Sequence, residues 1–386
     1  MQSDQTRPET DTTAETDSDR PTPDSEAVSA AQSNTASTPT PEPARRRRSR
    51  PWLLACLLAA LIALLVYRPA WRADAAVWAR TTAMDTFHIS PRDIYAARLR
   101  IAGIEDSALG QRWRNAVARA GADPGRFTTR YATRGTFVPD TIEAHVYQTT
   151  LERGERFQVR LQRDAPACAG CRNALYADIE RRDTDSDDSN AWAHVSGLPA
   201  NGEIQSFVTD RDGDYRVVLQ PELAAAVRYD VAMARGGSLS FPVKGAAARD
   251  IGSGFGAPRD GGSRRHHGVD IFAARGTPVT AVADGRVRTG TGGIGGNHVW
   301  LSSGMLGIGG ARYYYAHLDS FNVESGASVS KGDVLGYVGN TGNARTTPPH
   351  LHFGIYTSFG PVDPAPFLRP PAQLAAVPST VVDSPL

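Results

Sequence analysis

The sequence predicts a mainly all-β protein that is attached to a membrane by a single N-terminal helix. Apolar and polar residues alternate with a period of two in much of residues 141–240, which is the period of strands that bury one face. Residues 241–370 contain short strand patterns separated by glycines and show no long helical period. An uncharged apolar run near the N-terminus supplies the expected transmembrane helix.

The first part of the chain predicts a cytoplasmic tail, residues 1–50, and a transmembrane anchor, residues 51–68. Residues 1–44 are rich in Ser, Thr, Pro and acidic residues and lack aromatic ones, a composition that predicts disorder. Five arginines follow within residues 45–50. The uncharged run from Trp52 to Tyr67 would form a helix of about 24 Å. Because arginines stay on the cytoplasmic side, everything after Arg68 is expected outside the cytoplasm.

Two other interpretations of the apolar run remain open. Ala73-Asp74-Ala75 resembles the cleavage site of a signal peptide, although the leader before the run is much longer than usual. The segment from Leu53 to Cys56 resembles a lipoprotein motif, but Cys56 lies at the beginning of the apolar run instead of at its end. We therefore expect a retained anchor, which N-terminal sequencing of the mature protein would distinguish from a cleaved one.

Residues 69–140 predict a helical spacer. Ser107 is suited to cap a helix, and Gly121 is suited to end it. The apolar residues between them recur at helical spacing: Leu109, Trp113, Ala116, Val117 and Ala120. The segment has no chemical signature, so we expect it to contribute packing and length.

Residues 141–240 predict a small antiparallel β-sandwich. Phe157, Val159 and Leu161 alternate with polar residues, and a second run of the same kind follows the turn at residues 212–214. That second run contains Tyr215, Val217 and Leu219. Short strands separated by turn signals are typical of a sandwich.

Two features of this expected sandwich have ordinary explanations. The acidic run at residues 183–188 has the spacing of a calcium loop but lacks the central glycine and the closing glutamate, so a solvated acidic loop is expected. Cys168 and Cys171 are expected to form a structural disulfide, because an exported domain lies in an oxidising compartment.

The chemistry of the chain is concentrated in its last third. The formal net charge of +1 does not indicate a nucleic-acid-binding surface over the whole protein. Six of the nine histidines lie between His266 and His352, in or near the patterns 266–270, 315–318 and 350–353. A catalytic zinc needs about three protein ligands from His, Asp or Glu and one open position for water. These patterns supply such a set and leave histidines for proton transfer.

Strand geometry accounts for the spacing within these patterns. Successive side chains of a strand point to opposite faces, so His350 and His352 share one face while Leu351 points into the core. His266 and Asp270 are four residues apart and also lie on one side if the segment is extended. Separate strands can therefore direct these side chains into one groove.

Neighbouring residues complete this interpretation. Gly268 should let another group approach the backbone closely, and Tyr315 and His317 should share a face. His267 should point away from its neighbouring ligand, and His298 should be a packed or surface residue of a strand. A structural zinc site is disfavoured, because such sites use mostly cysteine ligands and residues 241–370 contain none.

The three patterns closely resemble those of the lysostaphin/LytM-type zinc metalloendopeptidases. The segments that flank them match as well: Gly276–Val279, Ala283–Gly285, Gly296-Asn297, Lys331–Asp333 and Val362–Pro364. The resemblance covers about residues 241–370 and implies a LytM-type β-sheet metallopeptidase domain there. Residues 371–386 are expected to be a flexible tail.

The resemblance also implies an activity. The family cuts peptide bonds in bacterial peptidoglycan, in stem peptides or cross-links. Carried over by motif, His266, Asp270 and His352 would bind one zinc ion per chain, and His317 and His350 would be the catalytic histidines. Zinc activates its bound water and polarises the scissile carbonyl, so the histidines would share proton transfer and oxyanion stabilisation.

The expected location follows from the anchor and this activity. We expect a single-pass protein of the bacterial inner membrane whose catalytic domain lies in the periplasm or faces the wall, with peptidoglycan and the cytoplasmic membrane as partners. The sequence does not identify a regulatory protein partner. Some LytM-type domains have lost metal ligands and activate other wall hydrolases, so a non-catalytic binding module is the alternative function, and a scaffold between membrane and wall is a third. The complete ligand set favours the enzyme.

Overall fold

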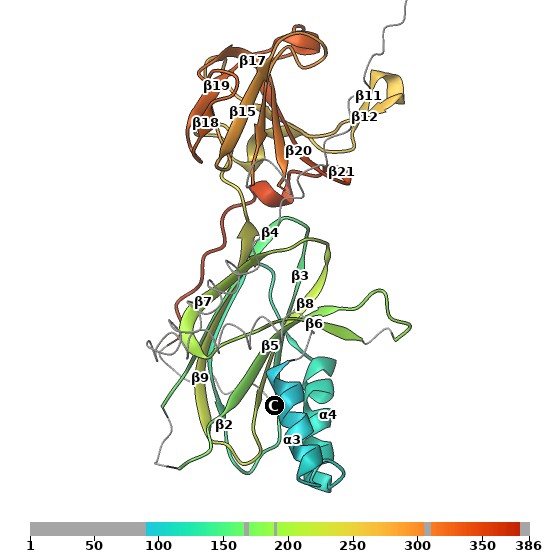
Figure 1. Ribbon diagram of the computed structural model, residues 1–386, viewed down its shortest axis with the longest axis vertical. Coiled ribbons are helices and arrows are strands. Elements are labelled where there is room, and N and C mark those ends of the chain that lie inside the picture. Colours follow the sequence, from blue (N-terminus) through green and yellow to red (C-terminus); the bar gives the residue numbers. More distant parts are fainter. Residues whose placement is uncertain (1–89, 166–169, 189–190, 305–309, 379–386) are drawn as a thin grey trace, which may run out of the picture. The chain divides into compact units, whose positions relative to one another are not determined.

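The computed structural model describes residues 90–165, 170–188, 191–304 and 310–378. The expected tail and anchor, residues 1–68, lie outside these ranges, as does the end of the expected C-terminal tail. Among the described residues, no helix is long and apolar enough to cross a membrane. The described part of the chain is mainly β-sheet and has two α-helices, which confirms the mainly β fold class (Figure 1).

The two helices are α3 (Pro91–Ile101) and α4 (Ala108–Ala122), and each begins at a capping serine. Ser107 accepts a hydrogen bond from the Gly110 N–H, as the sequence predicted for this position. Trp113 is buried and its indole N–H donates to the Pro221 carbonyl at 2.8 Å, which fixes α4 against strand β8 (Gly213–Pro221). Leu109, predicted to belong to the same apolar face, is 55% exposed.

Two sheets follow and form the predicted sandwich. The five-stranded sheet has the order β1-β3-β8-β5-β6, and the four-stranded sheet has the order β2-β9-β4-β7. The strands of the first are β1 (Gly125–Arg126), β3 (His145–Leu151), β5 (Leu175–Arg182), β6 (Trp192–Gly197) and β8 (Gly213–Pro221). Those of the second are β2 (Arg130–Phe137), β4 (Glu155–Arg163), β7 (Asn201–Val208) and β9 (Val227–Gly237).

The sandwich begins earlier than the alternation pattern indicated. Strand β2 lies within residues 69–140, the range expected to be helical spacer, and pairs with β9 from Arg130↔Ala234 to Phe137↔Val227. Its sequence contains Thr133, Arg134 and Thr136 among few apolar residues, so a two-residue period is not visible there. Pairing with the apolar strand β9 therefore determines its structure more than its own pattern does.

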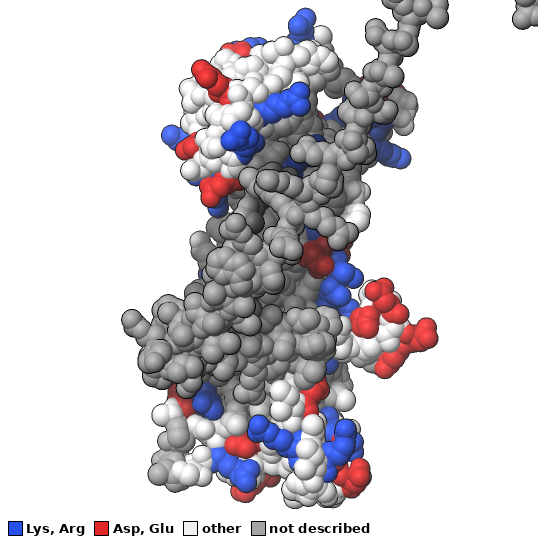
Figure 2. Space-filling model, in the orientation of Figure 1, with Lys and Arg blue, Asp and Glu red and all other residues white. Residues whose placement is uncertain are grey.

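Burial confirms the predicted alternation in β4. In β8 the predicted residues Tyr215, Val217 and Leu219 are buried, but Val218 is buried too, because it packs against α4 on the other face. Phe157, Val159 and Leu161 are each 1% exposed and form the core between the sheets with residues of β8. The acidic run lies in the loop between β5 and β6, where Figure 2 shows acidic side chains gathered on a projecting hairpin. Cys171 is disulfide-bonded, whereas its expected partner, Cys168, lies outside the described residues.

The C-terminal domain is an all-β structure, as its glycine-punctuated pattern predicted. Its main sheet has the order β10-β13-β20-β17-β16-β15-β18, and β19 pairs with both β14 and β17. The central strands are β13 (Val269–Phe272), β20 (His350–Thr357), β17 (Arg312–Phe321) and β16 (Asn297–Ser302). Around them lie β10 (Ile251–Ser253), β14 (Pro278–Thr280), β15 (Gly285–Gly290), β18 (Ser328–Val329), β19 (Val334–Val338) and β21 (Gly360–Val362). A short hairpin, β11 (Pro258–Arg259) and β12 (Arg264–Arg265), precedes β13.

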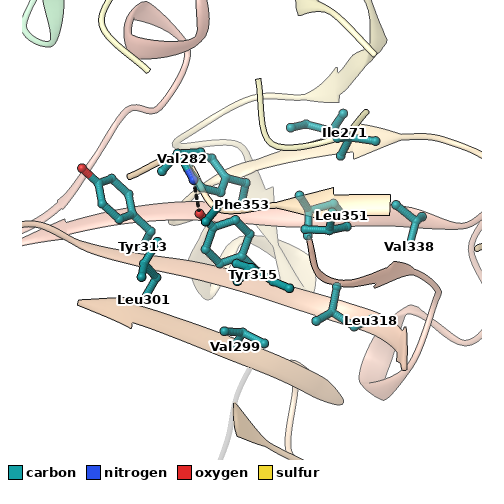
Figure 3. Packing of buried hydrophobic residues seen from close by; sticks show 14 of the residues in the cluster. Ile271, Val282, Val299, Leu301, Tyr313, Tyr315, Leu318, Val338, Leu351 and Phe353 are labelled. Atoms are coloured by element: carbon teal, nitrogen blue, oxygen red, sulfur yellow. Dashed lines mark hydrogen bonds between the residues drawn. The ribbon is translucent and has the colours of Figure 1, made fainter. Parts of the chain in front are cut away.

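One face of this sheet is covered by an apolar core. Tyr315, Leu351 and Phe353 are each 0% exposed and pack with residues of β13 and β16 (Figure 3). The Tyr315 hydroxyl accepts a hydrogen bond from the Val282 N–H at 3.0 Å. Because strand side chains alternate, this packing directs the intervening residues of β20 and β17 to the other face, where the candidate site lies.

Candidate active site

Neighbouring strands of the main sheet bring the predicted site residues together. Asp270 on β13 lies opposite His352 on β20, and His352 lies opposite Ala316 on β17. His350 lies on the same face of β20 as His352, and His317 follows Ala316. All five predicted site residues line one cleft of about 600 Å³.

Three side chains converge closely enough to hold a metal ion, and they are His266, Asp270 and His352. His266 Nε2 lies 3.0 Å from Asp270 Oδ1, and His352 Nδ1 lies 3.1 Å from the same oxygen. The two histidine nitrogens are 2.9 Å apart. Among the described residues this is the one such set. Two imidazole nitrogens and a carboxylate oxygen around one point fit zinc, whose ligands of this kind bind at about 2.0–2.2 Å.

Hydrogen bonds and burial set the orientation and the charge of these side chains in a way that suits a bound cation. His266 donates from Nδ1 to the Gly254 carbonyl at 2.8 Å, which orients the ring so that Nε2 faces Asp270. Burial acts to raise the pKa of Asp270, but hydrogen bonds with His266 and His352 outweigh it and hold that pKa well below its usual value. Burial lowers the pKa of His352 despite the nearby carboxylate. The donor set therefore combines an ionised carboxylate with a His352 imidazole whose protonated form is disfavoured.

Gly268 permits this arrangement. A Cβ at this position would lie 2.4 Å from the Phe353 carbonyl oxygen and 2.9 Å from Cε1 of His352. The predicted close approach is confirmed, and it is made by β20 itself. Any larger residue at Gly268 would separate β13 from the strand that carries His352.

The two remaining predicted histidines share a pattern of hydrogen bonds. His317 donates from Nδ1 to the Thr341 carbonyl, and His350 donates from Nδ1 to the Pro348 carbonyl, each at 2.9 Å. These hydrogen bonds turn both rings so that Nε2 is the nitrogen left for other partners, and the ring centroids lie 5.1 Å apart. Burial, and then the neighbouring His350, lowers the pKa of His317 to about 4. His317 is consequently a neutral proton acceptor at neutral pH.

The prediction that Tyr315 and His317 share a face was wrong. Tyr315 lies in the core, whereas His317 lines the cleft. His317 has a φ of +64°, a left-handed conformation that is uncommon for a residue other than glycine. This conformation interrupts the alternation of β17, so that Ala316 and His317 both line the cleft. Such backbone strain is typical of functional positions.

His267 also differs from its prediction, while His298 agrees. His267 is exposed and lines the same cleft as His266, because β13 starts at Val269 and strand alternation does not apply before it. His298 is partly buried and donates from Nδ1 to the Gly296 carbonyl at 3.0 Å, which is the packing role expected of it.

Sequence reasoning missed the aromatic wall of the cleft and one arginine. Trp300, Tyr314 and Tyr356 lie together, with the Trp300 and Tyr314 rings 4.4 Å apart. Tyr314 could have been found from alternation, because it precedes the core residue Tyr315. Arg259, which lies in the β11–β12 hairpin, forms an ion pair with Asp270 that no local sequence pattern indicates.

Sheet, cleft and donor set together define a metallopeptidase-type site, and the sequence match agrees with it. Residues 264–364 match Peptidase family M23. The C-terminal part of this chain is therefore a Peptidase family M23 domain, which confirms the resemblance expected from the three patterns.

Two curated relatives and one solved structure match about a quarter to a third of this chain. Glycyl-glycine endopeptidase ALE-1 of Staphylococcus capitis is 44% identical over 110 residues, which are 27% of this chain and 29% of that protein. L-Ala–D-Glu endopeptidase of Bacillus subtilis (strain 168) is 38% identical over 121 residues, which are 28% of this chain and 36% of that protein. The solved catalytic domain of lysostaphin from Staphylococcus simulans is 34% identical, covers 31% of this chain and 94% of its own, and has a TM-score of 0.28. The chain thus spans about a third of these two curated relatives.

Proposed function

We propose that the protein is a membrane-anchored zinc metalloendopeptidase that hydrolyses peptide bonds in bacterial peptidoglycan during cell-wall remodelling. One observation carries the proposal. A convergent His/Asp/His donor set and two further histidines, each hydrogen-bonded through Nδ1 to a backbone carbonyl, line the same cleft. Metal-assisted hydrolysis of a peptide bond requires both a metal site with an open position and positioned acid–base groups.

Each group has a distinct part in this chemistry. His266, Asp270 and His352 would hold one zinc ion, which lowers the pKa of bound water and polarises a carbonyl when present. His317 and His350 lie beside this set with Nε2 atoms that can accept a proton from the attacking water and return it to the leaving amine. Once protonated, either imidazole also stabilises negative charge on the carbonyl oxygen.

The substrate class rests on the relatives. Their names give different bonds, glycyl-glycine in one protein and L-Ala–D-Glu in another. Both are peptide bonds between small or acidic residues, so we propose a peptidoglycan peptide as substrate without choosing between a cross-link and a stem peptide. Digestion of purified peptidoglycan by the full chain, with mass spectrometry of the fragments, identifies the bond.

The anchor restricts where this activity takes place. We propose that residues 51–68 span the inner membrane, that residues 45–50 keep the N-terminus in the cytoplasm, and that the catalytic domain faces the wall. A reporter fused after Leu386 that functions only outside the cytoplasm should be active. Activity of a reporter that functions only inside would refute both the topology and the substrate.

The same digestion tests the enzyme against the alternative of a non-catalytic binding module that activates another wall hydrolase. The enzyme should release peptide fragments in the presence of zinc and lose this activity in His317→Ala. A binding module would bind peptidoglycan without releasing peptide fragments. The complete donor set is the reason to favour the enzyme.

A further inference from the structure

Arg259 contacts the expected zinc ligand Asp270 through a single nitrogen. Its Nη2 donates to Asp270 Oδ2 at 2.8 Å and to Ser253 Oγ at 2.7 Å. The Arg259 side chain is 27% exposed and that of Asp270 is 13% exposed, so the ion pair is largely shielded from water. Ser253 lies opposite Asp270 where β10 pairs with β13, so this serine also comes from the sheet that carries the ligand.

The two oxygens of Asp270 consequently have different surroundings. Oδ1 faces the histidine nitrogens, at 3.0 Å from His266 and 3.1 Å from His352. Oδ2 is held on the other side by the guanidinium of Arg259. A charge-assisted hydrogen bond of this kind is about twice as strong as a neutral one. It therefore opposes rotation of the carboxylate toward a position in which both oxygens face the metal.

We propose that Arg259 is a positioning residue that holds Asp270 as a one-oxygen ligand of the metal. The inference rests on the proposed zinc site and adds a reason why that site keeps an open position. A carboxylate that binds through both oxygens occupies the place that a catalytic metal reserves for water. Residues behind the ligands commonly set ligand orientation in this way.

Arg264 provides a matched control for Arg259. It lies directly opposite Arg259 in the β11–β12 hairpin and lines the same cleft. Its Nε, however, donates to Asp260 Oδ2 at 2.9 Å and not to a metal ligand. Replacing Arg264 therefore removes an equal charge from the same hairpin and leaves the contact with Asp270 intact.

The test compares full-length wild type, Arg259→Met and Arg264→Met in detergent. Zinc dissociation constants are measured by competition with a chelator, and coordination is followed through the visible absorption of the cobalt-substituted proteins. Arg259→Met should weaken zinc binding about tenfold, the lower end of the usual range for such partners. Its cobalt absorption should weaken, as expected for a change from four to five ligands, while Arg264→Met should match wild type in both measurements.

The outcomes separate this inference from the proposed function. Wild-type protein that does not retain zinc would refute the zinc site and both proposals. Two outcomes would overturn the positioning role alone, provided that the wild-type protein retains zinc. One is an unchanged zinc affinity and cobalt spectrum in Arg259→Met. The other is an equal loss of zinc affinity in Arg264→Met. If Arg259→Met does not fold, the zinc affinity of Ser253→Ala tests the inference instead, because this substitution removes the second hydrogen-bond partner of Arg259. That variant should weaken zinc binding in the same direction, and unchanged affinity would overturn the inference.

Discussion

Replacing Tyr315 with phenylalanine should destabilise the C-terminal domain and leave its metal ligands in place. The ring is 0% exposed, and its hydroxyl accepts the Val282 N–H at 3.0 Å (Figure 3). Phenylalanine keeps the ring and therefore nearly all of the packing, but it leaves the buried N–H of Val282 without an acceptor. Such a donor costs about 1–3 kcal/mol. Because Val282 is only 1% exposed, water cannot replace the hydroxyl, and we expect a loss of about 2 kcal/mol.

Tyr313→Phe is the control for this prediction. Tyr313 lies on the same strand and against the same core, but its hydroxyl points away from that core and the residue is 7% exposed (Figure 3). Hydrogen exchange across a urea series, read by mass spectrometry, reports the stability of this domain separately from the sandwich. Peptides containing Val282 should exchange at lower urea in Tyr315→Phe. Equal midpoints for Tyr315→Phe and wild type, or an equal loss in Tyr313→Phe, would refute the reasoning.

Three further predictions concern the site and the sandwich. His266→Ala and Asp270→Ala should each lose the single zinc ion, measured by metal analysis of purified protein; stoichiometric zinc in both would refute the ligand assignment. His317→Ala and His350→Ala should keep zinc but lose peptidoglycan hydrolysis by about a hundredfold, and near-normal turnover would remove that residue from the catalytic set. Burial raises the pKa of Asp178, on β5, to about 7. Ionisation of this carboxyl therefore lowers the free energy of unfolding increasingly from about pH 4 to pH 7, and by a constant amount above about pH 7. Asp178→Asn should therefore stabilise the sandwich at pH 7.5, by at most about 4 kcal/mol, and have little effect at pH 4; an equal effect at both pH values in urea unfolding would contradict this.

The two-residue periodicity of the sequence predicted the direction of side chains correctly where strands are regular and bury one face. It predicted the inward faces of β4 and β8, and it placed His350 and His352 opposite Leu351. These positions follow from alternation alone, because one face of each strand packs against a core. The absence of a side chain at Gly268 predicted a close neighbour there, although the sequence did not identify that neighbour as β20.

The predictions that were wrong or missing concern residues whose structure depends on more than the periodicity of their own segment. The left-handed backbone of His317 lies in a strand where alternation would have turned its side chain into the core. Strand β2 has little alternation of its own and is ordered by pairing with β9. Arg259 lies in the β11–β12 hairpin and contacts Asp270 on β13, and nothing in residues 258–265 indicates that contact.

The loop between β19 and β20 orients two histidines of the candidate site. Thr341 and Pro348 both belong to it, and their carbonyls determine which nitrogen of His317 and of His350 carries the proton. Two imidazoles from different strands thus depend on the main chain of one short segment. A substitution that shifts this segment would turn both rings together, so the geometry of the proposed catalytic pair could be changed without replacing either histidine.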